Sequence, residues 1–498
     1  MSIRASISAF AYRGARRRHA IELLLYSGAL VLLLLLLSAW ICTQGRLAPP
    51  PYQWNPSIQV APIPWNELAL ADIFALWLLG LGLFVLAPAS VAATVAAERR
   101  AGTLDQLRTT PLDPLALLCG LVVGAPARFY ILCAGPLALH VFAGLTGTIP
   151  LETLGATLVT LGAGGAACIL LALVVALAPR QETGGAFVAL GVAALLGISA
   201  FVAITLGHDR SAVNWAFLHP AGALNASMLA HDGLWRHLSV GYYSLDKFDT
   251  PRYASALAMT PLFSTLFAVI GGILLARAAC RKLGAPHLPL FSKTQAVALF
   301  ALSAAAIILP FDEHDSSSRL AGTVPLVYGM FLMPVMGLIG LFTTPSFEAW
   351  ALDLRRRQPS SGWTDDGKPH VATWTMLGVF VALLFVRLHE VGFPSQMREH
   401  HLASFVWMLT VAATLPIYML FASTRYSTAG TRWAFGIAVC AHLLLQIISI
   451  GMMHDSYLGT SEWTVVEIGL LAGVLVPGWV LFRQQMLRKR TLAGVEKI

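Results

Sequence analysis

The sequence predicts an all-α, polytopic integral membrane protein with about twelve transmembrane helices. Of its 498 residues, 57% are hydrophobic and only 12% are charged, which is about half the charged fraction of a soluble protein. Several apolar runs exceed the ~18 residues that a helix needs to cross a bilayer. We predict helices because an open sheet cannot pair its backbone groups in hydrocarbon.

The first part of the chain predicts a surface helix followed by six spans. Residues 1–20 carry several arginines and no acid, and their apolar positions can share one helical face. This pattern predicts a cytoplasmic amphipathic N-terminal helix on an anionic membrane surface, although a simple topogenic charge cluster explains the arginines equally well. The apolar runs that follow predict spans at about 21–42, 68–96, 127–146, 151–178, 185–206 and 257–276. Residues 115–125 are apolar but short, and we expect them to lie along or dip into the membrane.

The apolar pattern continues beyond the sixth span. Six more spans are predicted at about 294–310, 323–343, 372–387, 403–423, 433–453 and 464–482. We therefore divide the chain after residues 1–20 into a six-span domain, 21–290, and a second six-span membrane domain, 291–498. Two parallel six-helix halves are one hypothesis for this organisation.

The distribution of basic residues predicts the orientation. With both termini cytoplasmic, roughly three-quarters of the 33 Lys and Arg residues fall on the inner side, as the positive-inside rule requires. The net charge of +8 follows from this bias and does not indicate a nucleic-acid partner. By the same alternation of sides, residues 207–256 form an external loop.

Few ionisable residues lie inside the predicted spans. Asp72 and Glu467 fall within a turn or two of a membrane surface, and we expect His140 and His442 to be isolated. Ion-driven carriers usually need such groups as relay sites, so their scarcity favours energy delivered from outside the membrane. No metal-ligand spacing is present, and the six cysteines are interpreted as small buried hydrophobes.

The most informative stretch is the short charged segment 97–114, between the second and third spans. Leu104 and Leu107 are three residues apart and share a helical face, with arginines available for the polar side. Thr110-Pro111 and Asp113-Pro114 then end the helix, because proline disfavours helix in the preceding residue. A short amphipathic helix at the inner surface suits the docking of a soluble partner.

This segment resembles the coupling segment of type-2 ABC export permeases, the membrane subunits of drug, antibiotic and polysaccharide exporters. In that family an acidic-basic-Gly-Thr-Leu-Glu stretch, followed by Thr-Pro-Leu, contacts the ATPase; here Asp105 stands where Glu is usual. The alternative is an ordinary charged loop with helix capping. The residues that the resemblance assigns to ATPase coupling are Glu98, Arg99, Arg100, Gly102, Thr103, Leu104, Asp105, Leu107 and Pro111, with Arg180 and Glu182 in a second cytoplasmic turn.

The resemblance implies a permease subunit, in a twelve-span variant, that moves an amphipathic or lipid-like cargo outward across a bacterial inner membrane. The chain has no G-x-x-x-x-G-K-[ST] motif, so it is not itself the ATPase and is not expected to be an enzyme. ATP and Mg²⁺ would be bound by a separate ABC ATPase subunit, and the chain itself would bind no cofactor. The transporter would be a homodimer or a pseudo-dimeric single chain. The alternatives are a twelve-span secondary carrier and a membrane-embedded enzyme.

A second, weaker coupling segment is predicted in the latter half. Shifting the sequence by 248 residues, about half the chain, places Leu104 on Leu352 and Asp105 on Asp353. The alternative is a basic loop that merely obeys the positive-inside rule. The residues of this possible second segment are Leu352, Asp353, Arg355, Arg356 and Arg357.

Overall fold

The computed structural model describes residues 17–43, 67–104, 106, 113–149, 151–177, most of 190–200, 219–224, 251–285, 289–308 and single positions between 339 and 386. Across these residues every regular element is helical, which confirms the predicted all-α class. The chain divides into two compact units, Met1–Gly284 and Ala285–Ile498. The predicted domain boundaries and the parallel halves stay predictions.

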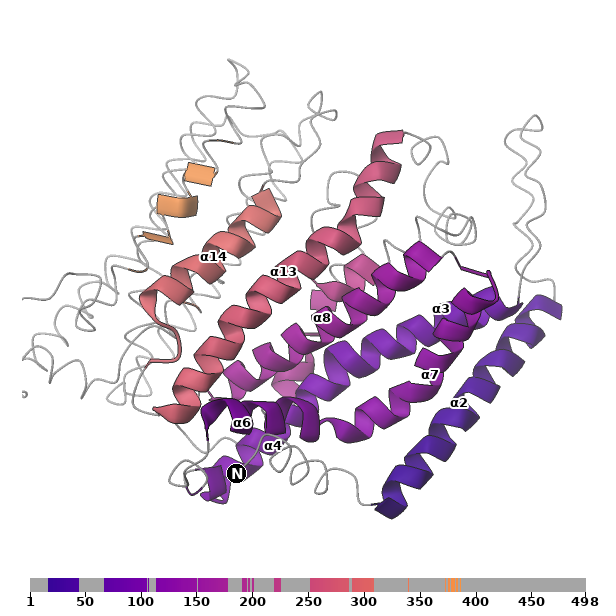
Figure 1. Cartoon of the computed structure of the whole chain (residues 1–498), viewed down its shortest axis with the longest axis horizontal. Helices are drawn as coiled ribbons and strands as arrows, with labels where there is room; N and C mark the ends of the chain where they lie inside the picture. Colours follow the sequence, from indigo (N-terminus) through magenta and orange to yellow (C-terminus); the bar gives the residue numbers. More distant parts are fainter. Residues whose placement is uncertain are drawn as a thin grey trace, which may run out of the picture. The chain divides into compact units, whose positions relative to one another are not determined.

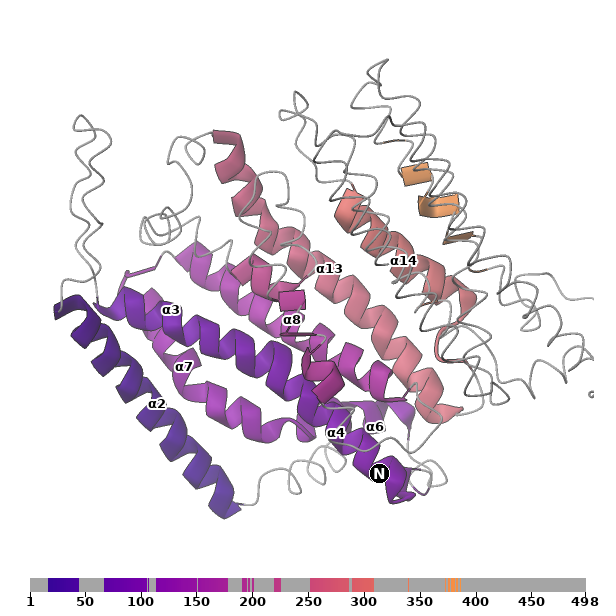
Figure 2. The ribbon, with the colours of Figure 1, turned by 180° about the vertical axis from the view of Figure 1, so that it is seen from behind.

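The first unit is a bundle of long apolar helices (Figures 1 and 2). Five of its described helices are long and apolar enough to cross a membrane. In chain order the described elements of this unit are α2 (Arg17–Thr43), α3 (Glu67–Gly80), the π-helical turns η1 (Leu81–Leu86), α4 (Ala87–Arg100), α6 (Pro114–Cys119), η2 (Gly120–Gly124), α7 (Ala127–Leu145), α8 (Leu151–Leu177) and α13 (Pro251–Gly284).

The hydropathy pattern placed most of the spans in this unit well. The candidate spans Ala20–Ile41, Leu68–Arg100, Ala127–Leu145, Leu151–Leu177 and Pro261–Gly284 correspond to predicted spans one to four and six. Predicted span five is described only as helical pieces between residues 190 and 200. The stretch after Asp113 is a separate short helix, α6 with η2, that is too short to cross a bilayer.

In the second unit, α14 (Lys293–Ile308) lies where the seventh span is predicted. The other five spans predicted for this half, and residues 1–16 of the predicted N-terminal helix, fall on positions outside the described residues or described only singly. The structure therefore supports a multi-pass membrane protein, while the number twelve stays a prediction.

Two packing groups build the first unit. Helices α2, α3 and α7 pack against one another around Leu34, Ala71, Ala75 and Leu139. Helix α8 packs along both α4 and α13. Because α3, η1 and α4 form one continuous helix, this helix belongs to both groups and joins them (Figure 1).

A serine on α2 repairs the backbone of α7 at Pro136. Proline has no N–H, so the carbonyl of Leu132, four residues earlier, lacks its helical donor. The Ser27 hydroxyl donates to that carbonyl over 2.8 Å and accepts from the N–H of Gly135 over 2.8 Å. A side chain on Gly135 would collide with Ser27, since a Cβ there would lie 2.5 Å from the serine Oγ. The proline therefore fixes where α2 and α7 meet.

At the start of α7, a tyrosine hydroxyl pairs another carbonyl that a proline leaves without a donor. Pro126 leaves the carbonyl of Val122 without a helical donor, and the Tyr130 hydroxyl donates to it over 2.9 Å. The wider turns of η2 precede Pro126, and η1 precedes Pro88 in the same way. We attribute both π-helical segments to these prolines, because a π bulge accommodates a missing backbone bond within a helix.

We predict that Ser27→Ala lowers the stability of the protein by about 1–2 kcal/mol, because it leaves a buried carbonyl unpaired in an apolar surrounding. The measurement is thermal unfolding of the purified chain in detergent. Ser38→Ala is the matched control, because the Ser38 hydroxyl donates to Leu34 in its own helix, where the carbonyl keeps its backbone donor. Equal losses in the two variants would contradict this account of Pro136.

Candidate functional site

The predicted coupling segment is a capped helix end followed by a new helical turn. Helix α4 ends at Arg100, and Gly102 then adopts a positive φ of 70°. Its N–H donates to the carbonyl of Arg99 over 3.1 Å, the pattern of a helix that closes with a left-handed residue. Glycine is required there because other residues adopt this conformation at a cost of about 1–2 kcal/mol. The chain is helical again at Thr103 and Leu104.

Side chains of the segment hold this turn to the end of α4. The Thr103 hydroxyl lies 3.0 Å from the backbone carbonyl of Glu98 and also contacts the carboxylate of Glu98. Arg99 and Arg100 occupy the last turn of α4, where positive charge is favoured by the helix dipole. Within the motif, Glu98, Gly102 and Thr103 therefore act locally by closing the end of α4.

Arg99 extends this turn to a second helix. One of its guanidinium nitrogens, Nη1, donates to the carbonyl of Ala176 over 3.0 Å. Ala176 lies in the last turn of α8, where carbonyls have no partner within their own helix. The ends of α4 and α8 are thus tied together, and predicted contact residue Arg180 follows only three residues after α8 ends.

Within the predicted coupling segment, some described residues are exposed and others are buried in the protein core. Leu104 is only 1% exposed and belongs to the core of the protein itself, so in this conformation its side chain is not offered to a partner. Arg100, Ala101 and Gln106 are exposed. The other predicted contact residues lie outside the described residues: Asp105, Leu107, Pro111, Arg180, Glu182, Leu352, Asp353, Arg355, Arg356 and Arg357.

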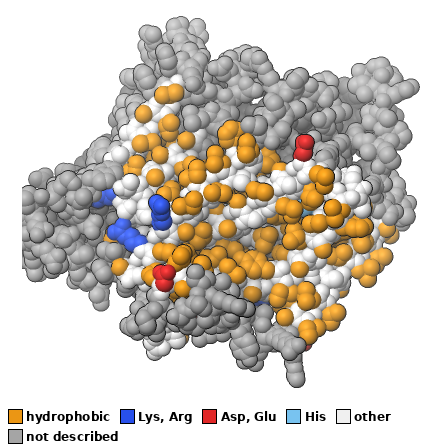
Figure 3. All heavy atoms as spheres, viewed as in Figure 1, with side chains coloured by type: hydrophobic (Ala, Val, Ile, Leu, Met, Phe, Trp, Pro, Cys, Tyr) orange, Lys and Arg blue, Asp and Glu red, His pale blue; other side chains and the backbone are white. Residues whose placement is uncertain are grey.

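Positive charge gathers at this end of the bundle. Helix α13 carries Arg281 and Lys282 in its last turn, and its final residue Gly284 packs against Pro114 of α6. Figure 1 shows the ends of α4 and α13 close to α6. Figure 3 shows Lys and Arg side chains collected toward that end, while most of the described face is hydrophobic. This is the pattern expected of the inner surface of a membrane protein.

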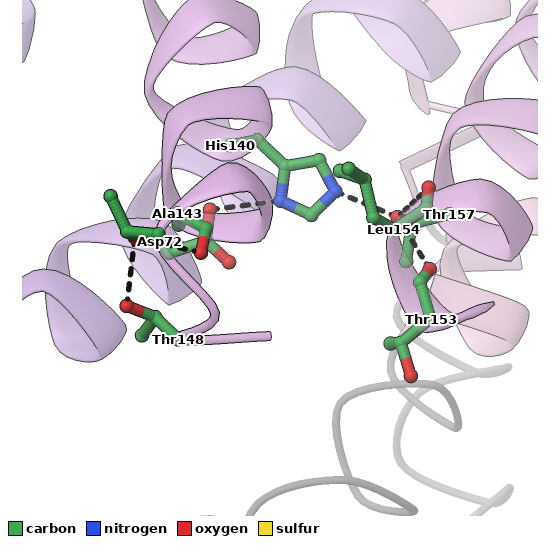
Figure 4. Close-up of polar contacts among 8 residues, drawn as sticks. Asp72, His140, Ala143, Thr148, Thr153, Leu154 and Thr157 are labelled. Atoms are coloured by element: carbon green, nitrogen blue, oxygen red, sulfur yellow. Dashed lines mark hydrogen bonds and ion pairs between the residues drawn. The ribbon is translucent and has the colours of Figure 1, made fainter. Parts of the chain in front are cut away.

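The opposite end of the bundle holds a buried polar network that sequence reasoning missed. His140 Nδ1 lies 2.8 Å from Asp72 Oδ1, and His140 Nε2 lies 2.7 Å from Thr157 Oγ1 (Figure 4). The side chains of His140 and Asp72 are 0% and 4% exposed. The prediction that His140 is isolated is therefore wrong, because three helices bring residues distant in sequence together.

This network lies far from the basic turn. Asp72 and Arg99 belong to one continuous helix, α3–η1–α4, so about 40 Å of helix separates them at 1.5 Å per residue. Asp72 is near the start of α3, His140 near the end of α7 and Thr157 near the start of α8. Asp72, a charged residue within a predicted span, was the one sign of this network in the sequence. Its partners could not be identified there, because they depend on how the helices pack.

Residues 219–224 correct a second prediction. We expected 207–256 to lie outside the membrane, yet this short helix packs halfway along the spans. Pro220 fills a notch at Gly164 in the middle of α8, where an added Cβ would lie 2.4 Å from the Pro220 Cβ. Leu224 lies near Gly80, in the middle of the continuous α3–η1–α4 helix. At least this part of the segment is therefore inserted between helices.

His219 stands at the start of the inserted helix with an unpaired nitrogen. Its ring meets Phe84 edge to face, with centroids 5.8 Å apart. The backbone N–H of Ala221 donates to His219 Nδ1 over 3.1 Å, so the neutral ring carries its hydrogen on Nε2. The side chain is buried, and within the described structure Nε2 has no hydrogen-bond partner.

We predict that Gly164→Ala destabilises the protein by about 1–3 kcal/mol, because the new methyl group would displace the rigid ring of Pro220. The matched control is Gly162→Ala on the same helix, where an added Cβ meets nothing within 4 Å. That variant should be neutral or stabilising by up to about 1 kcal/mol, since alanine is the better helix former. Thermal unfolding distinguishes them, and a Gly164 variant as stable as the control would mean that 219–224 is not seated on α8.

Comparison with known proteins does not identify the chain: no protein-family model matches it, and no curated protein or solved structure is significantly similar. A functional assignment therefore depends on the residues and geometry described above.

Proposed function

We propose that this chain is the membrane permease subunit of an ATP-driven exporter and that a separate ATPase docks on the turn that follows α4. The observation that carries the proposal is the bond from Arg99 to the carbonyl of Ala176. It ties the turn that resembles a coupling segment to the end of α8. The second predicted contact, Arg180 and Glu182, begins a few residues later in the chain.

The turn has the properties that a docking site needs. Its backbone is fixed by the Gly102 cap and by the contact of Thr103 with Glu98, so little order would have to be gained on binding. Arg100, Ala101 and Gln106 are exposed and would make the contacts, while Leu104 anchors the turn from inside. Leu104 would therefore act by positioning the turn rather than by entering a groove on the partner.

A push on this turn would reach the rest of the bundle through packed helices. Helix α4 packs on α8, and α8 packs on α13 and holds the inserted 219–224 helix at Gly164. In this mechanism, closure of the ATPase would rock α4 and α8 together, because Arg99 joins their ends. Cargo of an amphipathic or lipid-like kind suits the apolar surfaces between these helices.

The buried Asp72–His140 pair favours a second candidate, a secondary carrier driven by an ion gradient. Ionisable residues within membrane spans mark ion pathways in such proteins. The two candidates differ in their energy source. Transport by reconstituted vesicles that requires ATP and a second subunit supports the exporter, whereas transport by the chain alone under a proton gradient supports the carrier.

We predict that Arg100→Glu and Ala101→Trp abolish co-purification of an ATP-binding subunit in mild detergent, because one reverses a charge and the other adds bulk at exposed positions of the turn. The readout is the amount of that subunit recovered per permease, identified by mass spectrometry. Leu151→Trp is the control, since Leu151 is 67% exposed at the opposite end of α8.

The expected result is at least a tenfold loss of the ATPase with either turn variant and none with the control, which corresponds to about 1.4 kcal/mol of binding free energy. Unchanged recovery with both turn variants would overturn the docking site. Recovery of no ATP-binding subunit even with the wild-type chain would overturn the exporter proposal and favour the carrier.

A further inference from the structure

The hydrogen-bond network around His140 has a fixed direction. Thr157 Oγ1 lies 2.9 Å from the carbonyl oxygens of Thr153 and Leu154, and a carbonyl can only accept. The single hydroxyl hydrogen of Thr157 is therefore used on its own helix. The contact with His140, at 2.7 Å, then requires His140 Nε2 to be the donor. The Nε2 atom of His140 carries a hydrogen whichever charge state the ring has.

This direction determines the other side of the ring. The 2.8 Å contact between His140 Nδ1 and Asp72 Oδ1 needs one hydrogen between the two atoms. That hydrogen belongs either to an imidazolium facing a carboxylate or to a carboxylic acid facing a neutral imidazole. If it leaves, two lone pairs face each other at 2.8 Å, with the full negative charge of Asp72 buried. The closed contact therefore contains one removable proton.

We infer that Asp72 and His140 form a proton-binding site that joins α3 to α7 and releases its proton when the two helices separate. The ligand is a single proton, held between Nδ1 and Oδ1. On binding, the proton forms the bond between the two helices; on release, it leaves as solvent-bound H⁺ while the ring keeps its hydrogen on Nε2. The inference concerns this chain alone and does not depend on an ATPase partner.

Asp72 and His140 are the only titratable residues described where α3, α7 and α8 meet. The neighbouring packing is apolar, from Leu34, Ala71, Ala75 and Leu139. The nearest other described acid along the packed helices is Glu152, which is exposed in the first turn of α8. The remaining charged and titratable side chains described on the helices packed around the pair lie farther along them: Glu22, Tyr26, Glu98, Arg99, Arg100, Arg128, Tyr130, Cys133, Cys168, Arg277, Cys280, Arg281 and Lys282.

Because Asp72 and His140 are buried, loss of the shared proton is coupled to separation of α3 and α7. A buried carboxylate without its partner is strongly unfavourable in an apolar surrounding, so the deprotonated pair must open to water. Because the closed arrangement holds one shared proton, the α3–α7 contact weakens as the pH rises and that proton is lost. Movement of these helices during transport would therefore carry a proton on and off the protein.

The test uses the full chain in lipid nanodiscs, labelled with ¹⁵N-histidine, and follows the ring nitrogens by NMR from pH 5 to 10. The His140 signals are identified by their loss in His140→Gln. We expect Nε2 to stay protonated throughout and Nδ1 to lose its shared proton as the pH rises. A pair that shows no change over this range, or a His140 ring without a hydrogen on Nε2, would overturn the proposal.

Two further variants separate proton binding from simple packing. Asp72→Asn can donate from its amide to a neutral Nδ1, so the contact should survive and the pH-dependent change at Nδ1 should disappear. Thr157→Ser keeps the hydroxyl and should titrate like the wild type, whereas Thr157→Val should shift the transition. If Asp72→Asn keeps the wild-type titration, the proton does not belong to the pair, and the proposal fails. Neither result bears on ATPase docking.

Discussion

A chain that lies in hydrocarbon must pair its polar groups with one another, and this constraint governs the structure of the described bundle. It acts most visibly at the prolines, which deprive a carbonyl of its donor. Ser27 supplies the donor at Pro136 from a neighbouring helix, and Tyr130 supplies it at Pro126 from the next turn of α7. Helix contacts in this protein are thus specified by hydroxyl groups as well as by apolar packing.

The same constraint explains the two ends of the bundle. At one end, Arg99 caps a carbonyl of α8, and Thr103 binds the last turn of α4. At the other end, Asp72, His140 and Thr157 satisfy each other across three helices. Two described exceptions are Arg281, whose Nε is buried without a partner near the end of α13, and His219, whose Nε2 is buried and unpaired in the middle of the bundle. An unpaired buried donor costs about 1–3 kcal/mol, so the inserted 219–224 helix is held there by its packing on Gly164 and Phe84.

The positions of most spans could be predicted from the sequence, because they depend on the length and hydropathy of apolar runs. Contacts between helices could not be predicted, because they depend on how the helices pack. Helix α8 spans Leu151–Leu177, close to the predicted 151–178, because the length of an apolar run in the sequence gives the length of the span. The pairing of Asp72 with His140 could not be predicted, since the two are 68 residues apart and meet only through the packing of α3 on α7. The position of 219–224 was predicted wrongly because the alternation of sides assigns a whole loop to one side and cannot recognise a segment that returns between helices.

The predicted coupling segment shows both outcomes within a few residues. Helix α4 ends at Arg100 and the chain turns at Gly102, whose positive φ provides the turn. The helix-ending role of Pro111 stays a prediction, because Pro111 lies outside the described residues. Leu104 was expected to face a partner, but its burial assigns it to the core of this chain. A single sequence cannot distinguish these roles, because a leucine three residues from another leucine shares a face with it whichever way that face points.

The most direct test of the account is the side of the membrane on which the basic turn lies. We would replace the six natural cysteines, introduce Ala101→Cys or Leu151→Cys, and label each variant with a maleimide that cannot cross membranes. Cys at position 101 should react only in inside-out vesicles, and Cys at position 151 only in intact cells. Labelling of position 101 from outside would contradict the account, because no cytoplasmic ATPase could then reach the turn.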